Sequence, residues 1–427
     1  MKDIEAAKET QLFRPFRAVG FVCDHTPFFL EYNSSEPHII TSIGHNYHSY
    51  NLSQLKLTFS GDKQERKINS VVSWKMFIFT TCGPNILRWS RGKLQETYEG
   101  HTSDIYLLYT FGDILISVSK DHCMNIWHLS SPGNASSSLY GSIQFPENFT
   151  ITSIVHPHTY LNKILVGSDE GIMQIWNIRS KKMIYQFTSF DSSIICMEQS
   201  PALDVIGIGL QDGRILIKNI KQDKNIAQFL HNEGGPVTSL SFRDDKRHAI
   251  LVSGNFSGQI AIWDLNKKKL STIMNDVHDG PISSLKFVPN EPLLITSGRD
   301  NSLKVWIFDQ SDGTGRLLRF RSGHYDTPTR IRFYNSVQFI VSVAEDHTMR
   351  MFNVFRERQN RELSQGKLES KARKENIKAE DLKLPIISQF STSTIRERDW
   401  DNIISIHRDS NFAYTWNWRN KKLGKHR

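Results

Sequence analysis

The sequence predicts an all-β fold made of short antiparallel strands that recur along its 427 residues. A short phrase returns about every 40 to 50 residues: an apolar residue, any residue, an apolar residue, then an aromatic residue or its substitute. A period of about 40–45 residues with four short strands per unit is typical of a β-propeller. The count of complete cycles is compatible with seven or eight four-stranded blades. The anchors of the phrase are Tyr50, Trp89, Trp127, Trp176, Lys218, Trp263, Trp306, Phe352 and Trp416.

Strands can be located within each cycle, most clearly in residues 281–309. A first strand is expected near 282–287 and ends at the turn Pro-Asn-Glu-Pro. An apolar strand follows at 293–297, and an alternating strand at 303–308 places every second residue on one face. Other cycles repeat this order, so each is expected to form one small antiparallel sheet.

Three cycles also share a set of polar side chains with constant spacing. In each, Asp follows Ser or Thr by four residues and precedes the aromatic anchor by six, and His lies 26 or 28 residues before the anchor. Ser, His and Asp together are the components of a catalytic triad. An enzyme needs one triad, however, whereas three copies in register indicate a scaffold inside each repeat. The sets are His101, Ser117, Asp121 and Trp127; His278, Thr296, Asp300 and Trp306; and His324, Ser342, Asp346 and Phe352.

We expect the Asp of each set to hold one imidazole nitrogen, while the hydroxyl and the indole N–H complete a buried hydrogen-bonded chain. Other cycles lack members of the set: in the fifth, Lys218 replaces tryptophan and Ile208 replaces Ser or Thr. Those blades are expected to rest on packing alone. The pattern resembles the WD-repeat propeller family, although only Trp263-Asp264 spells the dipeptide. No catalytic residue is predicted.

The chain is divided here into four parts. Residues 1–15 are expected to form an N-terminal tail, 16–355 the WD-repeat propeller, 356–384 a charged flexible insert, and 385–427 the start of a second, incomplete propeller with a basic tail. The insert interleaves both charge signs and has few large apolar residues, which favours disorder over a solvated helix.

A part-cycle cannot bury its own apolar face, because each repeat needs its neighbours. The last cycle is therefore expected to leave Ile403, Ile404 and Phe412 partly exposed, and the chain to be a fragment or a shortened form of a longer tandem-propeller protein. The first cycle, residues 16–50, either belongs to the first ring or completes the second one. The sequence leaves these two alternatives open.

The formal net charge of +9 is concentrated near the C-terminal end. Residues 356–383 contain nine Lys and Arg against six Asp and Glu, and the last nine residues contain five Lys and Arg and no acid. A basic flank on a nearly neutral body indicates an anionic partner such as nucleic acid. The alternative is a lysine-rich tail that only keeps the protein soluble, which explains the same charge counts equally well.

Other compositional features exclude several classes of protein. No apolar run is long enough to span a membrane, and the first residues do not form a secretory signal. Four cysteines lie far apart, which argues against a zinc site and a disulfide framework and predicts buried thiols. The nearest histidine pair, His156 and His158, has no cysteine nearby. We expect a soluble intracellular protein without metal or cofactor.

Five segments carry a narrower resemblance. The segments are LFRPFRAVGFVCDHTPFFL (12–30), HPHTYLNKILVGSDEGIMQIWNI (156–178), PALDVIGIGLQDG (201–213), GTGRLLRFRSGH (313–324) and RERDWDNIISIH (396–407). Together they resemble the U3 small nucleolar RNA-associated protein 21 family, a WD-repeat component of the small-subunit processome, over nearly the whole chain. Members of this family have two tandem propellers and a helical C-terminal domain, so the chain resembles the first propeller and the entry to the second.

The resemblance implies a non-catalytic scaffold of the nucleus and nucleolus that serves ribosome biogenesis and rRNA processing. It implies as partners the other WD-repeat proteins of the UTP-B subcomplex, together with U3 small nucleolar RNA and pre-ribosomal RNA, directly or indirectly. It implies no membrane and no small-molecule substrate. One alternative is a WD-repeat adaptor of another complex, such as a ubiquitin-ligase substrate receptor. The other is an enzyme, and its only support is the repeated sets of His, Ser or Thr, and Asp.

Two basic segments are candidates for contact with RNA or an acidic partner. The segment Gly-Thr-Gly-Arg is not followed by Gly-Lys-Ser/Thr or by a helical pattern, so a phosphate-binding loop is disfavoured. A loop at the edge of a blade that presents its arginines outward is expected instead. Without an RNA-recognition module, any RNA contact would be directed at the backbone and sensitive to salt. The candidate residues are Arg316, Arg319, Arg321, Lys371, Arg373 and Lys374.

Overall fold

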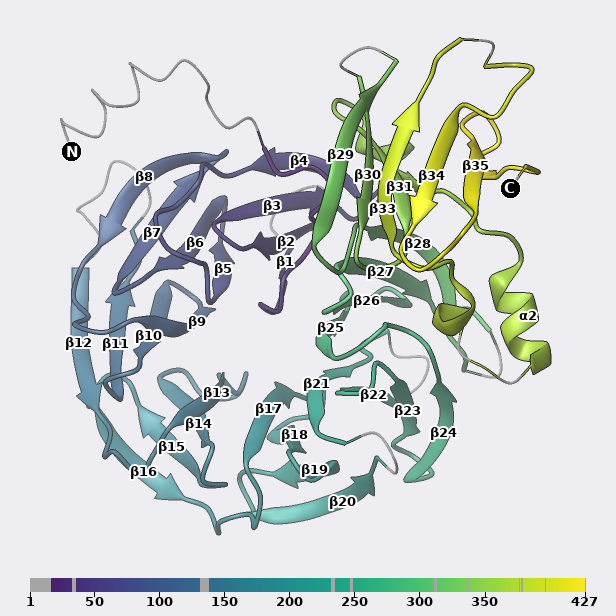
Figure 1. The fold of residues 1–427 in the computed structure, drawn as a ribbon. Coiled ribbons are helices and arrows are strands. Elements are labelled where there is room, and N and C mark those ends of the chain that lie inside the picture. Colours follow the sequence, from purple (N-terminus) through teal and green to yellow (C-terminus); the bar gives the residue numbers. More distant parts are fainter. Residues whose placement is uncertain are drawn as a thin grey trace, which may run out of the picture. The chain divides into compact units, whose positions relative to one another are not determined.

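The computed structural model describes residues 17–32, 36–130, 138–231, 235–245, 249–310, 313–335, 338–375, 377, 379–395 and 397–426. These residues form four-stranded antiparallel sheets joined by turns (Figure 1). They divide into two compact units. The first unit is Val22–Pro328, and the second is Thr329–Arg427 together with the N-terminal residues up to Phe21.

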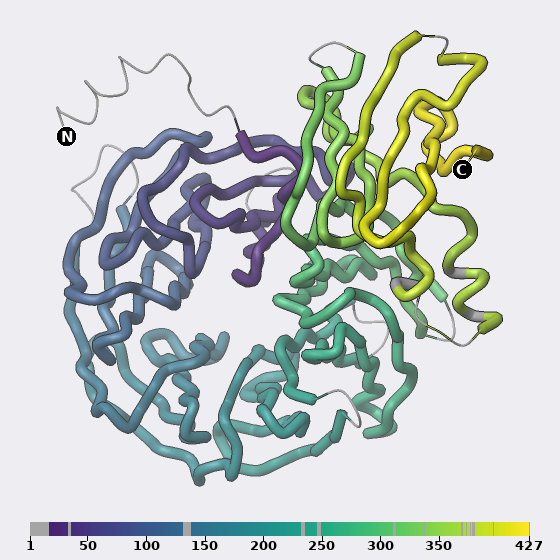
Figure 2. The backbone as a smooth tube through the Cα atoms, in the orientation of Figure 1, coloured from purple at the N-terminus to yellow at the C-terminus, as the bar shows by residue number. Residues whose placement is uncertain are grey.

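The first unit contains seven four-stranded sheets among its described residues, here called blades one to seven in chain order. Figure 2 shows the colour changing steadily around the ring, so neighbouring blades are consecutive in the sequence. The strands are, in blade one, β1 (Phe29–Glu31), β2 (His38–Ile43), β3 (Asn46–Asn51) and β4 (Lys56–Ser60); in blade two, β5 (Val71–Trp74), β6 (Phe77–Cys82), β7 (Asn85–Ser90) and β8 (Lys93–Tyr98); in blade three, β9 (Ile105–Phe111), β10 (Ile114–Ser119), β11 (Cys123–His128) and β12 (Ser138–Gln144); in blade four, β13 (Ile151–Val155), β14 (Lys163–Ser168), β15 (Met173–Asn177) and β16 (Lys182–Gln186); in blade five, β17 (Ile194–Gln199), β18 (Val205–Leu210), β19 (Arg214–Asn219) and β20 (Lys224–Leu230); in blade six, β21 (Val237–Phe242), β22 (Ile250–Asn255), β23 (Ile260–Asp264) and β24 (Lys269–Met274); and in blade seven, β25 (Ile282–Phe287), β26 (Leu293–Gly298), β27 (Ser302–Ile307) and β28 (Arg316–Ser322).

The register within a blade follows one pattern. In blade five the second and third strands pair without interruption, from Val205↔Asn219 to Gly209↔Ile215. The fourth strand then slips by one residue against the third, between Ile217 and Lys218. The other blades of this unit have the same irregularity on the fourth strand. An extra residue on one strand increases the local twist, which bends the outer strand of each blade.

A separate apolar core fills the space between each pair of neighbouring blades. Between blades four and five it includes Leu165, Ile194 and Ile206, all fully buried. The remaining contiguous blades pack in the same way. The core between blades seven and one includes Leu303 and Tyr50. Burial of apolar area at every interface is the main favourable term in folding, and the last core closes the ring.

Polar contacts also join blade seven to blade one. The backbone N–H groups of Val22 and Cys23 donate to the Asn301 side-chain oxygen at 2.7 and 3.3 Å. The Arg321 side chain donates to the Leu55 carbonyl at 2.8 Å. The ring therefore closes between two complete blades, with no strand shared between the ends of the unit.

The second unit contains two four-stranded sheets among its described residues. Their shared core includes Tyr334, Leu363 and Trp416, each buried to at least 99%. Strand β34 is buried on one face at Ile403 and exposed on the other at Ile404. The elements are β29 (Pro328–Tyr334), β30 (Phe339–Ala344), β31 (Met349–Asn353), η1 (Glu357–Gln359), β32 (Arg361–Glu362), α2 (Leu368–Glu375), η2 (Ala379–Leu382), β33 (Ile387–Thr392), β34 (Ile403–His407), β35 (Ala413–Asn417) and β36 (Lys422–Leu423).

The structure resolves the number of blades that the sequence left open. The eighth cycle, which ends at Phe352, forms the sheet β29–β32 and shares its core with β33–β36 in the second unit. The boundary therefore lies between Pro328 and Thr329 rather than after residue 355, and the second unit begins before residue 385. The repeat period could not reveal this, because the cycles on both sides of the boundary look alike.

The first cycle is divided between the two units. Residues from Val22 onward build blade one, whereas the chain up to Phe21 belongs to the second unit. Within the second unit, Arg17 forms an ion pair with Glu357 at 3.0 Å and also donates to the Val354 carbonyl. Neither of the two alternatives for residues 16–50 therefore holds for the whole segment. The predicted tail, residues 1–15, lies outside the described residues.

The expectation of a flexible insert at 356–384 is wrong for the described residues in it. They include η1, β32, α2 and η2, and β32 is the fourth strand of its sheet, pairing Arg361 with Met351. Fourth strands lie at the edge of a blade, and a strand of two charged residues carries no apolar pattern that the sequence could reveal. Of the three residues expected to stay partly exposed, Ile404 is 48% and Phe412 61% exposed, but Ile403 is fully buried.

The four cysteines are free thiols, and Cys23 alone among them is buried. Burial raises the pKa of Cys23 well above its usual range. The expectation of buried thiols therefore holds for one residue, while the other three are partly exposed. In the part of the chain that the structure describes, no helix combines the length and the apolar character needed to cross a membrane.

Candidate functional site

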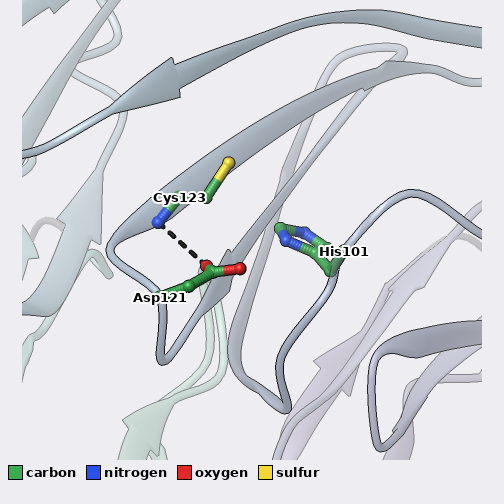
Figure 3. Close-up of side chains that lie close together, drawn as sticks. All are labelled: His101, Asp121 and Cys123. Carbon is green, nitrogen blue, oxygen red and sulfur yellow. Dashed lines mark hydrogen bonds between the residues drawn. The ribbon is translucent and has the colours of Figure 1, made fainter.

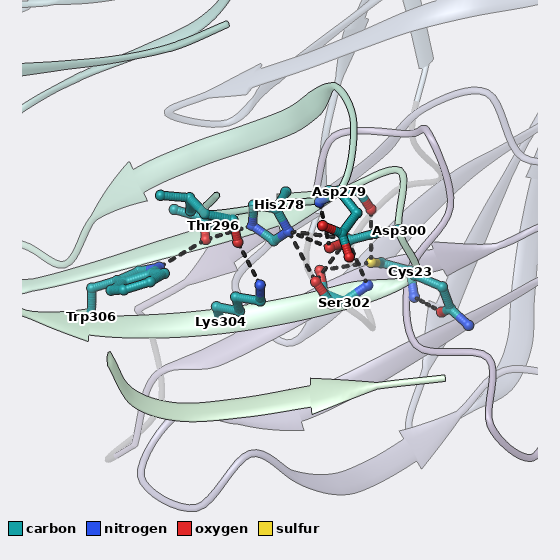
Figure 4. A network of polar contacts seen from close by, with 11 residues as sticks. Cys23, His278, Asp279, Thr296, Asp300, Ser302, Lys304 and Trp306 are labelled. Carbon is teal, nitrogen blue, oxygen red and sulfur yellow. Dashed lines mark hydrogen bonds and ion pairs between the residues drawn. The ribbon is translucent and has the colours of Figure 1, made fainter. Parts of the chain in front are cut away.

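Blade seven holds the most complete polar network. His278 precedes β25, Thr296 lies on β26, Asp300 lies in the turn that follows, and Trp306 lies on β27 (Figure 4). The Trp306 indole N–H donates to the Thr296 hydroxyl at 3.1 Å. The Thr296 hydroxyl lies 2.8 Å from His278 Nε2, and His278 Nδ1 lies 3.0 Å from Asp300 Oδ1. The structure thus brings all four members of this predicted set together.

The order of donors in this network is fixed by the groups at its two ends. Indole N–H can only donate and an ionised carboxylate can only accept. The Thr296 hydroxyl therefore donates to His278 Nε2, and His278 Nδ1–H donates to Asp300. The Ser302 hydroxyl and the Asp279 backbone N–H also donate to Asp300. Each polar group in the chain has a partner.

The Asp300 carboxylate is stabilised in its charged form. Burial by itself would raise its pKa, but the hydrogen bond from His278, the nearby Lys304 ammonium and the hydrogen bond from Ser302 outweigh burial and lower the pKa to about 2. The side chain is ionised at neutral pH, as the donor order requires.

The third blade builds a related network in which a serine hydroxyl lies between the histidine and the aspartate. The Trp127 indole N–H donates to the Ser117 hydroxyl at 2.9 Å, and Ser117 lies 2.6 Å from His101 Nε2. His101 Nδ1 lies 2.8 Å from the Ser119 hydroxyl, which in turn donates to Asp121. Asp121 therefore reaches the imidazole through Ser119 and not directly as expected, because it turns outward to accept a hydrogen bond from Thr102.

His101, Asp121 and Cys123 also offer ligand atoms within 4.8 Å of one another (Figure 3). Both imidazole nitrogens have hydroxyl partners, and Asp121 accepts from the Cys123 backbone N–H at 3.2 Å. Burial lowers the pKa of His101, whereas burial followed by the Asp121 charge raises the pKa of the Cys123 thiol. Protein hydrogen bonds account for the polar atoms of the group, including one from the Cys123 thiol to the Asn125 side-chain oxygen at 3.4 Å. We assign no metal to this group.

The third predicted set is divided by the unit boundary. His324 belongs to the first unit, and Ser342, Asp346 and Phe352 belong to the second. His324 accepts a hydrogen bond at its backbone carbonyl from the Asn301 side chain at 2.7 Å. Asp346 accepts from the backbone N–H and the hydroxyl of Thr348, at 3.0 and 2.7 Å.

Other blades keep parts of the network that sequence reasoning missed. In blade two, Trp89 donates to Thr80 at 2.8 Å, and Gln64 occupies the position of the imidazole, donating to the same hydroxyl at 2.6 Å. In blade six, Trp263 donates to Ser253 at 2.9 Å. In the second unit, Trp416 donates to Ser405, which lies 3.0 Å from His407 Nε2. These blades do not rest on packing alone. The spacing of nine to eleven residues between hydroxyl and tryptophan was the available signal.

Blade five replaces the network with a buried cation. The Lys218 side chain is 3% exposed and its ammonium lies 2.5 Å from Asp223 Oδ1. The same ammonium lies 5.3 Å from the centre of the Phe187 ring and 5.7 Å from that of Phe190. Aromatic faces attract a desolvated cation. An ion pair and two rings therefore take the place of the indole and its hydroxyl partner.

The candidate arginines lie on strand β28 and not on a loop. Arg316 and Arg319 are exposed, and Arg316 forms an ion pair with Asp309 at 3.0 Å. Arg321 is half-buried and its hydrogen bond to Leu55 helps to close the ring. The sequence analysis predicted a loop at this place. The mixture of basic and apolar residues belongs instead to the edge strand of a blade. The other candidates lie on α2, where Lys371 and Lys374 are exposed; the Arg373 side chain is outside the described part of the chain.

Two family models match the chain one after the other. The model of the WDR36/Utp21 first beta-propeller matches residues 39–309, within the seven-bladed unit. The chain belongs to the WDR36/Utp21 family. The model of the WDR36/Utp21 second beta-propeller domain matches residues 329–427 and begins at the residue where the second unit begins. The WD-repeat propellers of the WDR36/Utp21 family belong to a non-enzymatic class of protein.

Curated relatives within the family match almost every residue of the chain. It is 36% identical to the U3 small nucleolar RNA-associated protein 21 homolog of Schizosaccharomyces pombe, over 99% of this chain and 47% of that protein. It is also 36% identical to human WD repeat-containing protein 36, over 98% of this chain and 47% of that protein. The chain thus spans about half the length of these relatives.

Solved structures share the fold at low sequence identity. The Saccharomyces cerevisiae protein Sqt1 matches with a TM-score of 0.57 and 14% identity, over 79% of this chain and 97% of that one. The computationally designed protein Ika8 matches with a TM-score of 0.51 and 18% identity, over 85% of this chain and 99% of that one. These likenesses agree with the propeller fold of the WDR36/Utp21 family and carry no argument about function.

Proposed function

We propose that the chain is part of a non-catalytic scaffold of the small-subunit processome, which supports U3 ribonucleoprotein assembly on pre-ribosomal RNA and processing of the small-subunit rRNA. The observation that carries this proposal is the 36% identity, over 99% of the chain, to a relative named for its association with U3 small nucleolar RNA. The same reasoning assigns the protein to the nucleolus, with WD-repeat proteins of the UTP-B subcomplex as its partners.

The arrangement of polar groups supports a scaffold. The Ser, His and Asp side chains that resemble catalytic groups are bonded to one another inside the blades, and Thr296 and Ser117 are fully buried. A hydroxyl in such a place stabilises its sheet and does not reach a substrate. What the propeller offers to other molecules is its surface, and that is the use expected of a scaffold.

Contact with RNA is assigned to exposed basic side chains of the two units. Arg316 and Arg319 on β28, and Lys371 and Lys374 on α2, are exposed. Arginine and lysine recognise phosphate without reading a base. Arg321 is left out of this assignment, because its guanidinium is engaged at the ring closure. RNA binding through these residues would be salt-sensitive and independent of sequence.

Co-purification from cells tests the proposal. The tagged chain is expressed in fission yeast, and U3 RNA in the purified fraction is measured by quantitative reverse transcription against an unrelated small nuclear RNA. Enrichment of U3 RNA, of UTP-B proteins and of nucleolar signal is expected. Recovery of a ubiquitin-ligase scaffold without U3 RNA would contradict the proposal and support the alternative adaptor function.

Direct RNA contact is tested separately with the purified chain and a single-stranded RNA oligonucleotide. Arg319→Glu and Lys371→Glu are each expected to weaken binding and to reduce the slope of log K against log salt by about one. Lys182→Glu, on the exposed strand β16, is the control with the same charge change. If the control weakens binding as much as the other two variants, the assignment of these residues is wrong.

A further inference from the structure

An apolar groove opens between blades five and six of the first unit. Its volume is about 500 Å³. One wall is formed by the turn between β17 and β18, with Pro201 and Ala202, and by Ile226 and Ala227 of β20. The other wall includes Ile250 of β22. A concave apolar surface of this size can hold one or two side chains of a partner.

The described residues of the two blades leave apolar side chains at the groove open to solvent. Ile226 is 40% exposed, and Leu203, next to the lining turn, is 75% exposed. In the same blades, the strands β18 and β22 are buried along their whole length. Exposed apolar surface inside a well-packed ring marks a place where another molecule binds.

Basic turns border the groove. The turn between β23 and β24 contributes Lys268 to its wall, with Lys267 and Lys269 beside it in the sequence. Strand β20, which contributes Ile226 to the wall, begins at Lys224, and Lys221 lies in the turn before that strand. All five lysines are exposed.

Few acids oppose these lysines. Asp223 is paired with the buried Lys218, and Asp264 accepts hydrogen bonds from the backbone of its own turn and lies 3.7 Å from the Lys267 ammonium. Asp244 is the acidic member of the lining, and Arg243 beside it is paired with Asp245. The rim therefore has an excess of positive charge.

Contacts hold these turns against the neighbouring blade. Lys268 donates to the Ile226 carbonyl at 3.0 Å, which fixes the lysine stem at the mouth of the groove. Asp223 accepts from the Tyr185 hydroxyl of blade four at 2.7 Å. The apolar walls and the lysines are thus parts of one surface.

We propose that this groove binds a peptide segment of another protein in which an apolar side chain is flanked by acidic residues. The apolar side chain enters between Ala202, Ile226 and Ile250, and the carboxylates pair with the lysines of the rim. RNA fits less well, since phosphate contact leaves the apolar walls uncovered and the lining offers a single aromatic ring, Phe242. The proposal concerns a surface of the first unit and does not depend on a role in U3 ribonucleoprotein assembly.

Peptide selection on the whole 427-residue chain tests the proposal without knowledge of the partner. A phage-displayed library of random peptides is panned on the biotinylated protein, and an enriched peptide is labelled with fluorescein and titrated by polarisation. Enriched sequences are expected to combine Leu, Ile or Phe with Asp or Glu. Failure to enrich such sequences, or enrichment of basic ones, overturns the proposal.

Two variants locate the binding. Ala202→Trp fills the groove from an exposed turn, and Lys268→Glu reverses the charge at its wall. Each is expected to raise the Kd of the peptide about tenfold or more. The control is Lys181→Glu. Lys181 occupies the corresponding turn of blade four with a similar backbone, φ 55° against 51° for Lys268. It is not among the lining residues of the groove, and its ammonium lies 5.7 Å from the Tyr140 ring of blade three.

The control should change the affinity by about twofold or less, and all three variants should keep the melting midpoint of the parent chain. If Lys268→Glu and Lys181→Glu weaken peptide binding equally and Ala202→Trp has no effect, the surface binds polyanions without specificity and the proposal is overturned. Competition by a poly(U) oligonucleotide that is unaffected by Ala202→Trp would do the same.

Discussion

Blades seven and five show two ways to fill the same place in a propeller blade. In blade seven, Trp306, Thr296, His278 and Asp300 form a chain of hydrogen bonds. In blade five, Lys218 stands at the position of the tryptophan and is paired with Asp223. Thr296, His278 and Asp300 in blade seven and Lys218 in blade five are all buried, so each polar group must have a partner. The comparison teaches that the blade requires satisfied polar groups at this place and not a particular set of residues.

The largest effect is expected from breaking the network of blade seven. Asp300→Asn places an amide where His278, Ser302 and the Asp279 N–H all donate to a carboxylate. The free energy of unfolding should fall by on the order of 1–3 kcal/mol, the cost of a disrupted buried network. Denaturant unfolding of the variant and the parent measures it. Unchanged stability would show that the network adds nothing to the blade.

Acid should weaken blade seven in a defined range of pH. The pKa of Asp300 is lowered from its ordinary value of 3.8 to about 2. For a depressed carboxyl pKa, the stabilisation is fully present above the unfolded value and is lost as pH falls through the folded value. The free energy of unfolding of the parent should therefore fall by about 2 kcal/mol between pH 4.5 and 2 because of Asp300. The variant Asp300→Asn lacks this carboxyl group and should not show that part of the pH dependence. Parallel stability curves for the two proteins would contradict the assignment.

Blade five should be less sensitive than blade seven. Lys218→Met keeps an apolar stem of similar length but removes the ion pair with Asp223 and the contact with the Phe187 ring. Asp223 is 26% exposed on its side chain and can be hydrated, so we expect a loss of about 1–2 kcal/mol in the free energy of unfolding. A gain in stability would show that desolvation of the ammonium outweighs its contacts.

The smallest effect is expected in blade three. Asp121 reaches His101 only through Ser119 and is partly exposed. Asp121→Asn should lower the free energy of unfolding by less than about 1 kcal/mol, because water can replace part of what is lost. The measurement is the same as for Asp300→Asn, which serves as its counterpart. A loss as large as that of Asp300→Asn would show that direct contact with the imidazole is not what distinguishes the two blades.

The repeat period allowed much of the fold to be predicted, because each blade is a local unit whose strands are consecutive in the chain. The positions of Trp127 and Trp306 and their hydroxyl partners could be read from spacing alone. Partners that replace a member by different chemistry could not. Gln64 takes the place of a histidine, and Ser119 joins His101 to Asp121. Neither residue belongs to the spacing pattern that the three predicted sets have in common, so the pattern could not reveal them.

By itself, the sequence determined that the chain repeats a four-stranded unit, because periodicity is written within one cycle. Only the tertiary structure decided that the first ring has seven blades, that the eighth cycle belongs to the second unit, and that the N-terminal residues divide between the two at Val22. These outcomes depend on which apolar faces pack together. The core that joins Leu303 to Tyr50 closes the ring between segments more than two hundred residues apart, and no pattern within one cycle encodes that contact.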